Sequence, residues 1–365
     1  MNITFHREDF LKPLSYVAGV AERRQTLPIL SYILLQHRDG KTVLTGTDLE
    51  VEVSTVTTGT AKSGGELTLP ARKLLDICRA LPEGSEIDIR QEGEKVVVKT
   101  GKSRFTLLTM PVSDFPALQT PPWEQSLTLK QGELKALLEQ THFCMAQQDV
   151  RYYLNGVLLE VSDGRLRAVA TDGHRMAVSE LALPGAKGDK QIIIPRKAVH
   201  EIARLLTATD DSLTLQIGQN HIGVQTGELT FTSKLIDGRY PDYHKVIPGT
   251  QTVHARLEAA EFQHALTRVA ILSSEKHRGV RLNTDKLIRI TAHNPEQEEA
   301  QEEIPTLEYA GPTVEIGFNV AYLIDAVGAI GASQVQFSLN DPNSSCTVKP
   351  AGQEYPLYVI MPMRL

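Results

Sequence analysis

The residues with the clearest potential for chemistry are Asp172 and His174, in the stretch Thr171-Asp172-Gly173-His174-Arg175. A carboxylate close to an imidazole has the residue types of a general acid/base pair. The corresponding positions earlier and later in the chain read Asp48-Leu49-Glu50 and Asn294-Pro295-Glu296, so neither keeps the histidine. Asp or Asn followed by Gly or Pro is typical of turns. We therefore interpret Asp172 as a turn residue, and an enzyme that uses Asp172 and His174, such as a hydrolase, is the alternative hypothesis.

The sequence offers no other catalytic, cofactor or metal motif. Its histidines have no metal-ligand spacing, and no phosphate-binding loop, nucleophile elbow or dinucleotide fingerprint occurs. Cys78, Cys144 and Cys346 are an odd number without C-x-x-C spacing, which favours buried, reduced thiols. The amino-terminal residues meet charge before any apolar run develops. We expect no metal, no cofactor and a cytoplasmic location.

Two basic pairs have the spacing of one helical face. Arg72 and Arg79 lie seven residues apart, as do Lys197 and Arg204. Such pairs suit either phosphate binding or an ordinary solvated surface, and composition leaves both open. A third region that corresponds to these pairs carries Ala321 and Gly328 instead, so the basic character is not uniform. The net charge of −6 argues mildly against a nucleic-acid partner, although it says nothing about where the charges lie.

These residues belong to a long internal repeat that must position them. Pro70 and Pro195 open similar blocks 125 residues apart, and the positions of Asp48, Asp172 and Asn294 recur after 124 and 122 residues. A period of this length matches a whole small domain rather than a solenoid unit. The 365 residues therefore predict three like domains, at 1–120, 121–249 and 250–365.

Each repeat combines two helices with many short strands. Helical periodicity predicts a first helix at 7–21, 131–146 and 259–273, and Pro70, Pro195 and Asn319 each open a second helix. Alternating segments such as 42–45, 86–90, 95–99 and 212–217 predict strands with one wet face, joined as hairpins. The predicted fold class is α+β, with antiparallel sheets and two helices in each repeat.

Several of these motifs together closely resemble those of the bacterial β sliding clamps, the processivity subunits of DNA polymerase III. The matching segments span the whole chain: Thr26-Leu27-Pro28-Ile29-Leu30, Thr45-Gly46-Thr47-Asp48-Leu49, Gln148-Asp149-Val150-Arg151-Tyr152-Tyr153, Ala170-Thr171-Asp172-Gly173-His174-Arg175, Gly238-Arg239-Tyr240-Pro241 and Met361-Pro362-Met363-Arg364-Leu365. The resemblance implies a ring without catalysis, formed by two head-to-tail subunits with sheets outside and helices inside. It further implies binding to double-stranded DNA without sequence preference, and docking of DNA polymerases, the clamp loader, mismatch-repair proteins and other proteins that carry a clamp-binding motif.

The resemblance also assigns residues to three sites. The DNA-facing set is Arg24, Arg72, Lys73, Arg79, Gln148, Tyr152, Tyr153, Arg196, Lys197 and Arg204. The peptide pocket, expected between the second and third domains, comprises Leu154, Thr171, Gly173, His174, Arg175, Met176, Pro241, Val246, Val359, Met361, Pro362, Met363 and Arg364, with a groove from Arg151, Tyr153, Asn319 and Tyr322. Met176 departs from the leucine expected there, a change that conserves volume.

The subunit contact would join two short apolar pairs and opposite charges. It implies Phe105 and Leu107 on one side, Ile271 and Leu272 on the other, and Arg104 near Glu299, Glu302 and Glu303. From the residues alone, that acidic run is more typical of a solvated face. A scaffold that never touches DNA is a further alternative.

Overall fold

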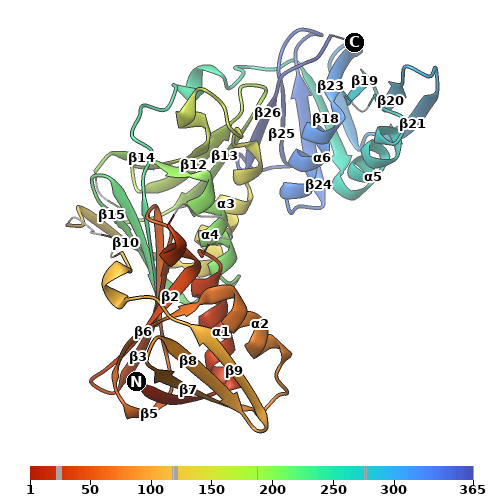
Figure 1. Cartoon of the computed structure of the whole chain (residues 1–365). Coiled ribbons are helices and arrows are strands. Elements are labelled where there is room, and N and C mark those ends of the chain that lie inside the picture. The colour runs from red at the N-terminus through yellow and green to blue at the C-terminus, as the bar shows by residue number, and fades with distance from the viewer. Residues whose placement is uncertain are drawn as a thin grey trace. The chain divides into compact units, whose positions relative to one another are not determined.

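The computed structural model describes residues 1–21, 27–116, 118, 122–186, 188–274, 276 and 278–364. They form two compact units, one from Met1–Gly132 with His200–Leu235 and the other from Glu133–Val199 with Ile236–Leu365 (Figure 1). Each unit contains two antiparallel sheets. The predicted α+β class is confirmed.

The first unit holds an eight-stranded and a five-stranded sheet. The larger sheet runs in the order β10 (Gln125–Lys130), β15 (Ser212–Ile217), β16 (His221–Thr226), β17 (Leu229–Lys234), β4 (Val51–Thr57), β3 (Lys41–Thr47), β2 (Tyr32–Arg38), β6 (Gly65–Pro70). The smaller runs β5 (Thr60–Ser63), β1 (Asn2–His6), β7 (Glu86–Glu92), β8 (Lys95–Thr100), β9 (Ser103–Leu108). Helices α1 (Arg7–Ala18) and α2 (Ala71–Ala80) bury their apolar faces, with Phe5 stacked on Phe10 at 4.3 Å between ring centroids.

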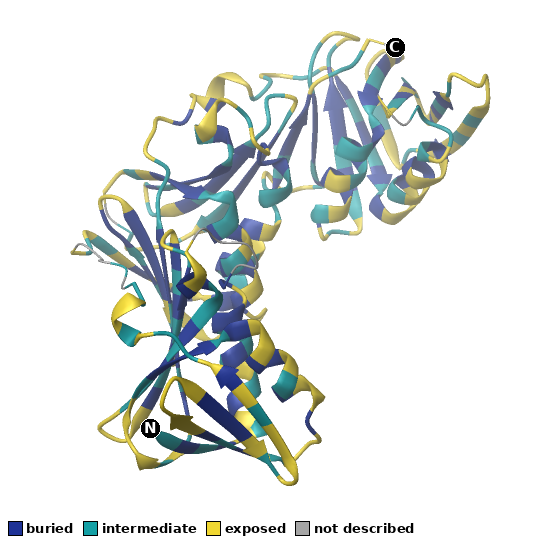
Figure 2. Cartoon of the chain, viewed as in Figure 1, coloured by how far each residue is buried: buried dark blue, intermediate teal, exposed yellow. Residues whose placement is uncertain are grey.

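The second unit holds a nine-stranded and a four-stranded sheet. The larger runs β14 (Lys190–Pro195), β11 (Gly156–Ser162), β12 (Arg165–Thr171), β13 (Arg175–Ala182), β26 (Leu357–Ile360), β25 (Cys346–Pro350), β24 (Gln334–Leu339), β18 (Val253–Glu258), β22 (Glu308–Ala310). The smaller runs β21 (Glu299–Pro305), β20 (Leu287–His293), β19 (Gly279–Thr284), β23 (Val314–Asn319). Buried and exposed residues alternate along many of these strands, as expected for sheets with one covered face (Figure 2).

The sequence repeats do not coincide with the compact units, because strands pair across repeats. In the first unit β17, from the second repeat, pairs with β4 from the first, with Phe231 opposite Val53. In the second unit β13, also from the second repeat, pairs with β26 from the third, with Met176 opposite Val359. The domain boundaries 1–120, 121–249 and 250–365 stay a prediction, and residues 120 and 121 lie outside the described residues.

Six α-helices occur in the described part of the chain, at the six places predicted. The remaining bounds are α3 (Gln131–Glu139), α4 (Arg196–Leu205), α5 (Ala259–Ala270) and α6 (Val320–Ala329). The first helices end earlier than the predicted 21, 146 and 273, and the error is largest for α3. There the Thr141 hydroxyl donates to the carbonyls of Leu137 and Leu138, 3.0 and 3.2 Å away, so the side chain satisfies the end of the helix.

Two features are absent from the described residues. No helix among them has the length and apolar character to cross a membrane. No group of three or more His, Cys, Asp or Glu side chains among them has the geometry to hold a metal ion.

Candidate functional site

A cavity of about 150 Å³ lies in the second unit, where β12 ends, β13 begins and β26 ends. Its floor is apolar, with Leu154, Met176 and Val359 each no more than 2% exposed. Its rim carries apolar groups open to solvent, with Val246 and Met361 41% and 42% exposed. The lining residues are Arg151, Leu154, Thr171, Gly173, His174, Arg175, Met176, Pro241, Val246, Val359 and Met361.

A tight turn forms one wall of this cavity and uses the Asp172 carboxylate for its own hydrogen bonds. Asp172 Oδ1 accepts from the backbone N–H groups of His174 and Arg175, both at 2.9 Å. The same geometry recurs in the first repeat, where Asp48 Oδ1 accepts from the N–H groups of Glu50 and Val51 at 2.9 and 2.7 Å. The turn interpretation is therefore confirmed. Asp172 accepts backbone hydrogen bonds in a turn that also occurs in the first repeat. This structural role argues against Asp172 as the acid of the enzyme hypothesis.

Arg175 links this turn to α6 and to the segment after α3. Its Nε donates to Asp172 Oδ2 at 3.2 Å, and its Nη1 donates to Asp325 Oδ2 at 2.6 Å. Its Nη2 donates to the Phe143 carbonyl at 2.8 Å, and the guanidinium lies 4.4 Å from the Tyr322 ring centroid. Two carboxylates thus neutralise the charge of Arg175. These contacts hold its planar guanidinium in place at the side of the cavity.

A second arginine is held at the mouth of the cavity. Arg151 Nη2 donates to Asp149 Oδ2 at 2.8 Å, and its Nε donates to Asp149 Oδ1 at 3.1 Å. The hydrogen bond from Arg151 holds the pKa of Asp149 at about 2. Gly173 allows this approach: its φ is +88°, and a Cβ there would lie 3.0 Å from Arg151 Nη2. The glycine therefore serves both the turn and the position of Arg151.

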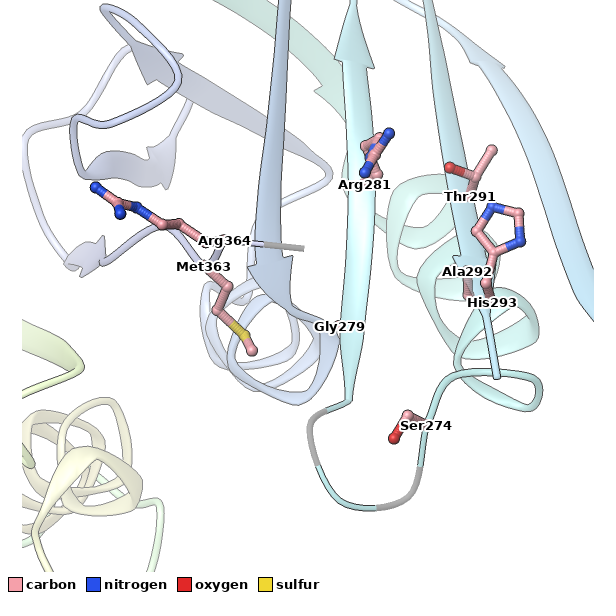
Figure 3. A pocket seen from close by; sticks show the side chains of 8 residues that line it. All are labelled: Ser274, Gly279, Arg281, Thr291, Ala292, His293, Met363 and Arg364. Atoms are coloured by element: carbon pink, nitrogen blue, oxygen red, sulfur yellow. The ribbon is translucent and has the colours of Figure 1, made fainter. Parts of the chain in front are cut away.

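The carboxyl-terminal tail closes the cavity on the side of β26. The Met361 N–H donates to the His174 carbonyl at 3.0 Å, which holds Met361 at the rim. Two residues later the Met363 N–H donates to the Gly317 carbonyl at 2.8 Å, so the tail continues along β23. Met363 and Arg364 are not among the residues that line the cavity. They line a second hollow instead (Figure 3).

The other predicted pocket residues do not line the cavity. Tyr153 packs, partly buried, against the apolar cluster that contains Leu154, Met176 and Val359. The Asn319 side chain caps α6 by accepting from the Ala321 N–H at 2.9 Å. Tyr322 supports Arg175, and Pro362 is half-buried in the tail.

The predicted DNA-facing residues divide into exposed and engaged groups. Arg72, Lys73 and Arg79 are exposed on α2, and Gln148 and Tyr152 are exposed ahead of β11. Arg196 is half-buried and donates to the Met145 carbonyl at 3.2 Å, and Lys197 is also half-buried and engaged. Arg24 lies outside the described residues.

Arg204 has a structural partner that sequence reasoning missed. Its Nη2 donates to the Tyr16 carbonyl at 3.0 Å, and its Nη1 donates to the Ser15 carbonyl at 3.4 Å, at the end of α1. Glu201 Oε2 accepts from Nη2 of the same guanidinium at 2.7 Å. A Cβ on Gly19 would lie 2.3 Å from Nη2, so the missing side chain admits the arginine. A cation at the carboxyl end of a helix donates hydrogen bonds to the terminal carbonyls and interacts favourably with the negative end of the helix dipole.

The residues predicted for the subunit contact lie on or near two edge strands. β9 ends the five-stranded sheet and carries Phe105, half-buried, and Leu107, 9% exposed. Its neighbour Leu108 is 63% exposed and was not predicted. Arg104 Nη2 lies 3.5 Å from Glu92 Oε2.

β21 ends the four-stranded sheet and carries the acidic residues. Glu302 accepts two hydrogen bonds from Arg268 at 2.6 and 2.9 Å, and Glu303 accepts one from Arg289 at 2.8 Å. Glu299 is exposed, Ile271 is 77% exposed and Leu272 is half-buried. Ion pairs within the chain thus already neutralise part of the acidic run.

Comparison with known proteins places this chain in one class, the sliding clamps of DNA polymerase III. Family models of the DNA polymerase III beta subunit match this chain in three consecutive segments. The model of the N-terminal domain matches residues 1–119, that of the central domain 128–242 and that of the C-terminal domain 244–364. The chain belongs to this family, and the resemblance seen in the sequence is confirmed.

Individual relatives match over their whole length. The chain is 52% identical to the beta sliding clamp of Pseudomonas aeruginosa and 48% identical to that of Escherichia coli K12, with all of each chain covered. A crystal structure of the Pseudomonas aeruginosa sliding clamp bound to griselimycin matches with a TM-score of 0.96 at 51% identity, again over both whole chains.

Proposed function

We propose that this chain is a processivity factor of DNA replication. Two copies close head to tail into a ring around duplex DNA, and the ring tethers a polymerase to the template. The observation that carries this proposal is the match of all three domains along the whole chain to sliding clamps. Retention by encirclement needs no strong contact with DNA, which explains how a protein with a net charge of −6 stays on DNA.

Exposed basic, amide and aromatic side chains would make the contacts with DNA. Arg72, Lys73 and Arg79 on α2, together with Gln148 and Tyr152, have the exposure that such contacts require. Contacts from cations to phosphates position a duplex without reading its sequence. We assign weaker roles to Arg196, Lys197 and Arg204, because hydrogen bonds or other contacts within the chain already engage their side chains.

The cavity at His174 is the docking site for short peptide segments of the polymerase, the clamp loader and repair proteins. Its apolar floor and polar rim suit an apolar side chain anchored by a segment whose backbone meets polar groups. Arg175 and Asp172 would not contact the peptide as free charges, because they are already paired. The rim would accept different partners through Met361, a flexible side chain that can adjust.

The ring would close through two edge strands, one from each subunit. An edge strand presents open N–H and C=O groups that another strand can pair with. We propose that β9 of one subunit, with Arg104, Phe105 and Leu107, meets β21 of a second copy, with Ile271 and Leu272 beside it. We also propose that the protein is not an enzyme and that it acts in the cytoplasm.

Two measurements test this function. A His174→Ala variant should bind a polymerase docking peptide about tenfold more weakly in fluorescence anisotropy, since the loss of one anchor contact costs about 1–2 kcal/mol. A His264→Ala variant, altered on the exposed face of α5, should bind as the unmodified protein does. The solution mass should be about twice 40.3 kDa. A stable monomer at micromolar concentration, or a hydrolytic turnover that depends on His174, would overturn the proposal.

A further inference from the structure

One wall of the docking cavity, formed by Pro241 and Val246, belongs to the connection between the second and third repeats. The short 3-10 helix η5 (Tyr243–Lys245) lies between these two residues. The Val246 N–H donates to the Tyr243 carbonyl at 3.0 Å, a contact within the connection itself. Tyr243 is only 4% exposed, whereas the residues on either side of it are exposed. The Tyr243 side chain therefore attaches this wall to the sheet beneath it.

The face of the nine-stranded sheet that carries the cavity floor changes from apolar to charged along β13. Met176 forms part of the floor, and Val178 belongs to the apolar cluster next to it. Glu180 follows two positions later and pairs with Arg167 on β12, which pairs with Glu160 on β11. Residues two positions apart in a strand, and directly paired residues, point to the same face. A row of three charged side chains therefore crosses the face that holds the floor.

This charged row is held in place by its own contacts. Arg167 Nε donates to Glu180 Oε2 at 3.0 Å, and Arg167 Nη1 lies 3.8 Å from Glu160 Oε2. The side chains of Glu160, Arg167 and Glu180 are 13%, 18% and 8% exposed. Arg165 also pairs with Glu180, so two cations balance two carboxylates. Charge-assisted hydrogen bonds among partly buried groups make the row a fixed support.

Tyr243 connects the apolar cluster to the charged row. Its ring is part of the cluster that contains Met176 and Val178. Its hydroxyl donates to Glu160 Oε2 at 2.9 Å and accepts from Arg167 Nη1 at 3.0 Å. Burial raises the pKa of Tyr243, so the phenol stays protonated and keeps its proton to donate. The two hydrogen bonds thus fix where the ring lies along the sheet, and with it the backbone on both sides.

We propose that Tyr243, Glu160 and Arg167 are positioning residues of the docking site. They hold Pro241 and Val246 at the distance from the floor that the apolar side chain of a partner peptide requires. None of the three positioning residues lines the cavity, so they act through the wall and not by touching the peptide. Pro241 lies two residues before Tyr243 and Val246 three residues after it, so a shift of the ring moves both. The inference rests on the proposed docking function of the cavity.

The test measures the affinity of a fluorescent docking peptide for the full-length protein. Tyr243→Phe keeps the buried ring and removes the hydroxyl, and it should weaken binding about fivefold, the equivalent of one net hydrogen bond. Tyr309→Phe is the matched control: the Tyr309 hydroxyl donates to the Pro312 carbonyl at 2.7 Å, and Tyr309 does not line the cavity. The control should bind the peptide as the unmodified protein does.

Variants of Glu160 test the hydrogen bond from its other side. Glu160→Met removes the acceptor and should weaken binding about as much as Tyr243→Phe, whereas Glu160→Gln keeps an acceptor and should recover most of that loss. The double variant Tyr243→Phe with Glu160→Met should bind no more weakly than either single variant, because both remove the same hydrogen bond. In protein with isotope-labelled valine methyl groups, the Val246 resonances should shift in Tyr243→Phe and stay in place in Tyr309→Phe.

The outcomes separate positioning from general stability and from docking itself. Unchanged peptide affinity in Tyr243→Phe would overturn the inference, as would losses that add in the double variant. An equal loss of affinity in Tyr309→Phe would show that lowered stability is the cause, and it would overturn the inference too. Failure of the peptide to bind the unmodified protein would instead overturn the docking function.

Discussion

At the scale of single residues, the docking cavity depends on a glycine that its counterpart in the first repeat does not need. Both repeats build the same turn, yet Leu49 occupies the position of Gly173 with a φ of +78°. A side chain is tolerated in the first repeat at some cost in backbone strain. In the second repeat it would meet Arg151. The glycine therefore marks the repeat that carries the site.

A Gly173→Ala substitution tests this dependence. Alanine at a positive φ should cost about 1 kcal/mol of stability, and its Cβ should also displace Arg151 from the cavity mouth. We expect a lowered melting temperature together with weaker peptide binding. Gly185→Ala is the matched control, because its φ is +100° and no heavy atom lies within 4 Å of the added Cβ. Equal peptide affinity in the two variants would show that the position of Arg151 does not matter for docking.

At the scale of elements, Arg204 shows where sequence patterns stop being informative. Its spacing from Lys197 predicted a shared basic helical face, and Arg204 is indeed on the surface. Its partners, however, are carbonyls at Ser15 and Tyr16, 189 and 188 residues away along the chain. Periodicity describes the helix that carries a residue and contains no information about such distant contacts.

An Arg204→Ala variant should lose about 1 kcal/mol of unfolding free energy, since the carboxyl end of α1 loses its cation and two donors. Arg79→Ala, altered at the corresponding exposed position of the first repeat, should stay within about 0.5 kcal/mol of the unmodified protein. Gly19→Ala provides an independent check, because its Cβ would push the guanidinium away while the charge stays. Chemical denaturation measures all three. Equal stability of the Arg204 and Arg79 variants would contradict the capping role.

The predictability of the other elements follows the range of the interactions involved. Helix starts at Pro70 and Pro195 and the strand at 212–217 were predicted well, because local residues determine them. The end of α3 was predicted wrongly, because the Thr141 hydroxyl intervenes. All eleven residues of the cavity lining were among those that the resemblance implied, whereas the continuation of the tail to Gly317 was not predicted. That contact depends on two segments that meet only in the folded chain.

At the scale of the whole molecule, repeats are joined through shared sheets. β17 with β4 in one unit, and β13 with β26 in the other, form continuous backbone ladders between repeats. A ring requires one more junction per subunit, and β9 and β21 are the edge strands that we assign to it. Closure at these edges in two copies would join six like domains into a closed ring around DNA.

The most direct test of the proposed function is retention on DNA before and after the DNA is cut. The clamp is loaded onto a nicked circular plasmid by its clamp loader, freed from unbound protein by gel filtration, and then exposed to a restriction enzyme that linearises the plasmid. A ring that encircles DNA should stay on the circle and slide off the new ends, and protein blocks bound at both ends should restore retention. Equal retention on circular and linear DNA would contradict encirclement.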